Sequence, residues 1–172
     1  MKASTSVILD PNSLFNSVRD MLDRGQLQAA LDFLESCGQS SRMVQNAKGV
    51  CMMRLGRHEP AVKTFRDLVF PNGSFAISDD TPTVFRSNYA TSLMLGGHVA
   101  TGLEILGHIP DRQHPAVVQL KDAVRNWKRS LSWFARIGLL IGIAPHRPFV
   151  MDSASAPGAI WFPRSDESPT TA

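Results

Sequence analysis

Residues 47–71 read AKGVCMMRLGRHEPAVKTFRDLVFP, and this stretch decides the fold. Apolar side chains recur in it at offsets of three and four residues, which share one face of an α-helix. Gly56 lies between two such runs, where a helix can end in a left-handed conformation at little cost to glycine. Ala61 is small enough for the second helix to pack closely on the first, and Phe65 fills the space beyond it. The stretch therefore predicts a pair of helices joined by a short turn.

The same pattern occurs three times along the chain, around the turn glycines Gly25, Gly56 and Gly97. Positions at fixed distances from each glycine keep their class, small with small or apolar with apolar. The column that begins with Val18 is the loosest. Such self-similarity predicts three copies of one helical hairpin. In chain order, the columns besides the turn glycines are Val18, Gly49 and Ala90; Met21, Met52 and Leu93; Ala30, Ala61 and Gly102; Leu34, Phe65 and Leu106; and Cys37, Leu68 and Ile109.

This arrangement resembles the tetratricopeptide repeat over about residues 11–113. The resemblance is clearest from Ala47 to Pro71, where the small residues, the turn glycine and the aromatic residue stand at the spacing of the family. It implies an all-α fold, a right-handed α-solenoid of three helical hairpins, in which the first helix of each pair lines a concave groove. The motif is specific for the fold and says little about function.

Helices are expected at about 11–24, 27–37, 41–55, 59–70, 82–96 and 99–108, and a seventh from about 114 to at least 134. The seventh carries one apolar stripe, which suits a helix that caps the last repeat. We therefore expect an N-terminal extension at 1–10, a repeat domain with its capping helix at 11–134, and a tail at 135–172. That tail is first apolar and then rich in proline and serine, and we expect it to be partly disordered. The stripe consists of Val117, Leu120, Val124, Trp127, Leu131 and Phe134.

The groove that the resemblance implies is the candidate functional site, and its composition is largely apolar and rich in methionine. Apolar patches of this extent mark interaction sites, and methionine adapts to irregular partners. We expect a protein–protein interaction scaffold or a chaperone-like adaptor that holds an apolar helix or peptide. The candidate groove residues are Phe15, Arg19, Leu22, Met43, Asn46, Val50, Met53, Val84, Thr91 and Met94.

The occupant of the groove is left open by the sequence. The chain's own apolar segments, 137–144 or 159–162, could fill it as readily as an external protein partner. A dimer interface and additional helices are further alternatives. The partner class is in each case a peptide or protein with an apolar face.

Positive charge is concentrated in residues 112–147, which hold seven Lys and Arg and a single acid, Asp122, in a chain of net charge +3. The basic and apolar segment 121–144 suggests an alternative function, a membrane-peripheral protein anchored there. The apolar run Leu131–Ala144 is shorter than the roughly 20 residues of a membrane span. The solvated outer face of a capping helix would explain the same charges, and nucleic acid is not the expected partner.

Catalysis is not expected from this sequence, because no nucleophile, acid–base or metal-ligand set stands at a productive spacing. The five histidines fall at turns and helix ends, without an accompanying carboxylate or cysteine motif. Cys37 and Cys51 are expected to be reduced, buried thiols. We therefore expect a protein without cofactor or metal, located in the cytoplasm.

Overall fold

The three turn glycines have the same backbone conformation and the same hydrogen bonds. Gly25, Gly56 and Gly97 have φ of 71°, 75° and 90° in the computed structural model. In each turn the residue after the glycine donates its N–H to a carbonyl five residues earlier, the pattern that closes a helix with a left-handed residue. These bonds are Gln26 to Met21 at 2.8 Å, Arg57 to Met52 at 2.9 Å and His98 to Leu93 at 2.8 Å. One turn is thus built three times.

The structure describes residues 11–74, 76–78, 80–140, 143, 147–151 and 157–160, and the regular elements within these ranges are helical. The fold is therefore all-α over the described chain, as predicted, and the first six expected helices are confirmed to within one residue at each end. The elements are α1 (Pro11–Asp23), α2 (Leu27–Ser36), α3 (Arg42–Arg54), α4 (His58–Val69), the 3₁₀ turn η1 (Pro71–Gly73), α5 (Thr83–Leu95), α6 (Val99–Gly107), α7 (Pro115–Ser130) and α8 (Trp133–Leu140).

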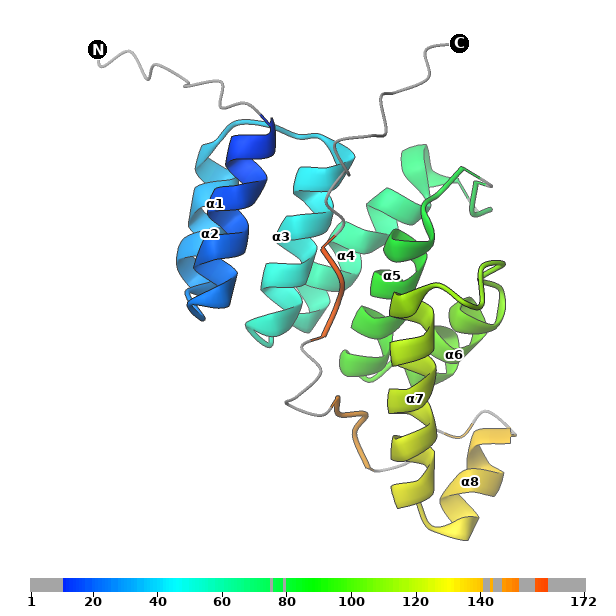
Figure 1. Ribbon diagram of the computed structural model, residues 1–172. Coiled ribbons are helices and arrows are strands. Elements are labelled where there is room, and N and C mark those ends of the chain that lie inside the picture. The colour runs from blue at the N-terminus through cyan, green and yellow to red at the C-terminus, as the bar shows by residue number, and fades with distance from the viewer. Residues whose placement is uncertain are drawn as a thin grey trace, which may run out of the picture.

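Helices adjacent in the chain from α1 to α6 pack side by side, and α5 also contacts α3 and α7 (Figure 1). Small residues allow these close contacts. A Cβ added to Gly49 of α3 would lie 2.6 Å from Cζ of Phe65 in α4, and one added to Gly102 of α6 would lie 2.9 Å from the carbonyl oxygen of Ala90 in α5. Both distances are too short for a side chain at these two positions, which explains why glycine stands at each of them.

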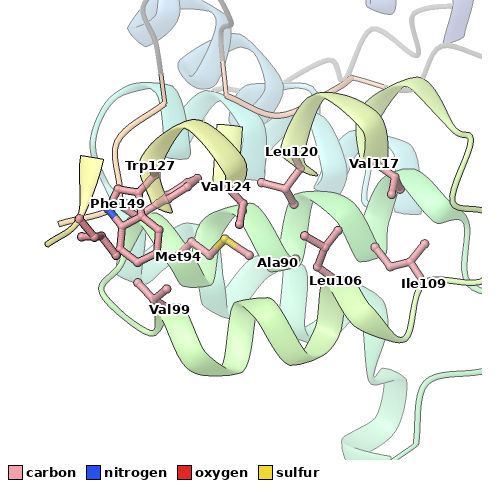
Figure 2. Close-up of a cluster of buried hydrophobic side chains, with 11 residues drawn as sticks. Ala90, Met94, Val99, Leu106, Ile109, Val117, Leu120, Val124, Trp127 and Phe149 are labelled. Carbon is pink, nitrogen blue, oxygen red and sulfur yellow. The ribbon is translucent and has the colours of Figure 1, made fainter. Parts of the chain in front are cut away.

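The core consists of three apolar clusters, each shared between successive helices. The first joins α1, α2 and α3, and the second joins α3, α4 and α5. The third joins α5, α6 and α7 and extends to Leu131 and Phe149 (Figure 2). In Figure 2, Val117, Leu120 and Val124 of α7 face the side chains of α5 and α6. The apolar stripe of α7 therefore packs on α5 and α6.

The prediction that the seventh helix continues to Phe134 is wrong. The helix α7 ends at Ser130, and Leu131 takes an extended conformation with ψ of 146°. Ser132 then begins α8, its hydroxyl accepting a hydrogen bond from the backbone N–H of Ala135 at 3.3 Å. The turn keeps Leu131 in the core but leaves Phe134 77% exposed. None of the described helices is long and apolar enough to cross a membrane.

Candidate peptide-binding groove

Residues 157–160 lie against α3 and α5, two helices that are distant from them in the sequence (Figure 1, the orange-red segment). Ala159 packs against the second apolar cluster, and Ile160 packs against both the first and the second. The chain therefore returns across the face where the first helices of successive pairs meet. This face is the candidate functional site, and it holds a segment of the chain itself.

The side-chain amide of Asn88 in α5 binds both polar groups of Ala159. Its Nδ2 donates to the Ala159 carbonyl oxygen at 2.8 Å, and its Oδ1 accepts the Ala159 N–H at 2.9 Å. The two bonds fix the orientation of the amide, since a flipped Asn88 would set two donors and two acceptors face to face. Asn88 thus satisfies both backbone polar groups of Ala159, as the residue of a neighbouring β-strand would.

Asn46 of α3 completes this polar contact from the opposite side of the groove. Its Oδ1 accepts from Asn88 Nδ2 at 2.8 Å, and its Nδ2 donates to the Ala159 carbonyl oxygen at 3.4 Å. Asn46 is fully buried and Asn88 is 1% exposed. Buried amides are costly without partners, so the carbonyl and N–H of Ala159 satisfy groups that the core would otherwise leave partly unpaired.

Arg54, the last residue of α3, binds the two preceding carbonyl groups of the segment. Its Nε donates to the Pro157 oxygen at 3.1 Å, and its Nη2 donates to the Gly158 oxygen at 3.0 Å. Burial lowers the pKa of the Arg54 guanidinium, partly offset by electrostatic interactions with Cys51 and Asp23. Arginine remains charged even so, and these are charge-assisted hydrogen bonds.

Gly158 fits a position that no other residue could occupy without rearrangement. Its φ is 81°, and a Cβ added there would clash with Cε of Met53 and lie 3.2 Å from Cγ2 of Val50. Both the left-handed backbone and the close approach to α3 favour glycine. Side chains of α3 and α5 thus bind the main chain of residues 157–159 and restrict the side chain at position 158.

Some of the predicted groove residues meet at this segment. Asn46 hydrogen-bonds to it, Val50 and Met53 face Gly158, and Thr91 lines a narrow cavity beside Gly158 and Ala159. All four are at most 3% exposed. These four residues therefore line the part of the groove that residues 157–160 occupy.

The other predicted residues lie to either side. The other predicted side chains of α1 and α3, apart from Arg19, are part of the first apolar cluster, on which Ile160 also packs. Val84 is part of the second cluster. Arg19 is exposed on α1. Met94 is fully buried in the third cluster, and its Cγ would lie 2.6 Å from a Cβ on Gly102. The cluster members in the first group are Phe15, Leu22 and Met43.

Sequence reasoning missed Asn88 and Arg54, the two residues with the most hydrogen bonds to the segment. Arg54 directly follows the predicted groove residue Met53, and Asn88 lies nine residues before its turn glycine, Gly97. Asn88 stands three residues before Thr91 and so shares its helix face. Nothing else in the local sequence marks this asparagine as a residue that binds a distant backbone.

The thiol of Cys51 lies beneath this site and is unreactive by its environment. Burial raises its pKa to about 11, and the nearby charge of Arg54 only partly opposes that shift. Thiolate is therefore a minor species at neutral pH. Among the residues that the structure describes, no three histidine, cysteine or acidic side chains come together as a metal site.

Comparison of the chain with protein-family models, with curated proteins and with solved structures found no match.

Proposed function

We propose that this chain is a peptide-binding scaffold of the tetratricopeptide type, a right-handed α-solenoid of three helical hairpins capped by α7. Its concave groove holds an extended apolar segment, and its own residues 157–160 are the resident occupant. The threefold turn at Gly25, Gly56 and Gly97 and the close helix contacts at Gly49 and Gly102 support the repeat architecture.

Main-chain recognition of residues 157–159 is the observation that carries this proposal. Asn46, Arg54 and Asn88 together bind three successive carbonyl groups and one N–H. Contacts of this kind supply affinity for any extended chain, while side-chain pockets supply selectivity. The pockets here select glycine at one position, a small residue at the next and a branched apolar residue at the third, as in Gly158-Ala159-Ile160.

A resident segment also lowers the apparent affinity of the groove for an external partner. Five residues, 152–156, connect Met151, which packs against the third cluster, to Pro157, so the segment is tethered close to the groove. Such a tether gives an effective concentration of the order of millimolar. An external peptide of equal intrinsic affinity therefore binds weakly until the resident segment is released.

The test opens the groove by one substitution in the full-length chain. Gly158→Val is expected to prevent the resident segment from seating, because valine disfavours a φ of 81° and its branched side chain would meet Val50 and Met53. The substitution lies outside the helices and should leave them intact. We expect a labelled peptide of sequence SAPGAIWF, residues 155–162, to bind Gly158→Val at least about tenfold more tightly than wild type. Fluorescence anisotropy titration measures both affinities.

Two controls separate the groove from non-specific adhesion. Adding Asn88→Ala to Gly158→Val should abolish peptide binding, whereas adding Asn126→Ala on the exposed face of α7 should not. The same peptide with valine in place of Gly158 should not bind either protein. Equal binding to all variants, or no binding to Gly158→Val, contradicts the proposed function.

A further inference from the structure

The short helix α8 exposes two adjacent aromatic side chains at its start. Trp133 is 66% exposed and Phe134 is 77% exposed, with ring centroids 5.8 Å apart in an edge-to-face contact. Ile143, which lies beside Gly138 of α8, is also exposed, at 59%. Large apolar groups gathered at one end of a molecule mark an interaction site.

Beside these aromatic residues lies an apolar pocket of about 470 Å³ between α6, α7 and α8. Leu103, Ile137 and Leu139 form its apolar walls together with the ring of Trp133. This volume is within the range of small-molecule and lipid-chain sites. The pocket is separate from the groove that holds residues 157–160, and this inference goes beyond the proposed peptide binding.

The rim of the pocket is cationic. Lys128 and Arg129 of α7 and Arg136 of α8 line it, and within the described ranges none of the three forms an ion pair. Arg125 also lines the pocket but pairs with Asp122 at 2.8 Å. The guanidinium of Arg136 donates to the backbone carbonyl oxygen of Arg129 at 2.9 Å, which holds this cation at the C-terminal end of α7. An anionic partner with an apolar part fits this rim and this pocket.

We propose that the α7–α8 end of the molecule is a docking surface for the interface of an anionic membrane. Phospholipid headgroups neutralise Lys128, Arg129 and Arg136, and the rings of Trp133 and Phe134 enter the boundary between headgroups and acyl chains. Tryptophan favours that boundary, and each lysine or arginine near an anionic surface adds to the attraction. An acyl chain can enter the pocket from the same side.

Phe134 decides between a bilayer and a soluble anionic amphiphile. It lies outside the residues that line the pocket and is the most exposed of the large apolar side chains described. A single amphiphile bound in the pocket leaves it in water, whereas a bilayer covers it. The α7–α8 surface therefore fits a lipid interface better than a free fatty acid.

The experiment is co-sedimentation of the full-length protein with vesicles of phosphatidylcholine alone or with about 30% phosphatidylserine. We expect binding to the anionic vesicles, weakened at about 0.5 M NaCl because salt screens exposed charges. Trp133→Ser with Phe134→Ser should abolish it. Lys128→Glu with Arg129→Glu should weaken it at least about tenfold.

Arg24→Glu with Lys63→Glu, at exposed positions outside α7 and α8, changes the net charge equally and is the matched control. It should retain most of the binding. Equal loss in both charge-reversal variants, full binding by the aromatic variant, or no binding of wild type to anionic vesicles overturns the proposal. Binding of lauric acid by wild type without vesicle binding assigns the pocket to a soluble amphiphile and also overturns it.

Discussion

Single glycines determine how closely the helices of this protein approach one another. Gly49 stands opposite Phe65, whose side chain is fully buried and would lie 2.6 Å from a Cβ on Gly49. A Cβ added to Gly107, at the end of α6, would meet no heavy atom within 4 Å. The two glycines therefore differ in packing although both lie in helices.

Gly49→Ala is expected to lower the free energy of unfolding by about 1–2 kcal/mol. The cost of overpacking, about 1–3 kcal/mol, exceeds the gain of up to about 1 kcal/mol from better helix propensity. Gly107→Ala should be neutral or slightly stabilising. Urea denaturation of the two variants measures the difference, and a Gly49→Ala protein as stable as wild type would show that α3 and α4 are not in close contact.

The residues of the groove could be predicted only in part, because spacing along one helix shows which residues share a face but not which distant segment they contact. Spacing from the turn glycines located Asn46, Val50 and Met53, because one helix face repeats every three to four residues. It missed Asn88, because a polar residue that binds a distant backbone has no local signature. Nor could it show that Gly158 would be the residue to fit beside Met53, since those two positions lie far apart in the chain.

At the scale of elements, the helices of the three hairpins could be predicted and the end of the molecule could not. The turn glycines and the periodicity of the apolar residues predict the bounds of six helices. The apolar stripe of α7 continues in phase through Leu131 to Phe134, so periodicity alone favours one long helix. The helix instead ends at Ser130, and Ser132 caps a new helix. A serine followed by aromatic residues is a weak sequence signal for such a cap.

Phe149, outside any helix, closes the open end of the third cluster. It is 3% exposed and packs edge-to-face on Trp127 at 5.7 Å between ring centroids. The indole N–H of Trp127 donates to the Pro148 carbonyl oxygen at 3.0 Å, which fixes the segment in place. Residues 147–151 are therefore part of the folded unit, within a region that the sequence assigned to an irregular tail.

Phe149→Ala should destabilise the protein by about 3–4 kcal/mol, the usual cost of deleting a buried phenylalanine. Val150→Ala, at the exposed neighbouring position, should change stability by less than about 0.5 kcal/mol. Thermal unfolding followed by circular dichroism compares the two. Similar melting temperatures for both variants would mean that residues 147–151 do not cover the core.

At the scale of the whole molecule, the chain folds back on itself twice after α8. Residues 147–151 cover the third cluster, and residues 157–160 lie along α3 and α5 (Figure 1). The first contact contributes to stability, because it buries large apolar groups. The second consists mainly of hydrogen bonds from side chains of α3 and α5 to the main chain of residues 157–159, and the proposed function requires that it can be exchanged without unfolding the helices.

Hydrogen exchange at the backbone N–H of Ala159 tests the occupied groove most directly. In the full-length protein this N–H is bonded to Asn88 Oδ1, and we expect it to exchange more than about tenfold more slowly than in the free peptide 155–162. Asn88→Ala should remove this protection, and Asn126→Ala should keep it. Exchange of Ala159 in wild type at the rate of the free peptide, with the helices protected, would contradict a groove filled by residues 157–160.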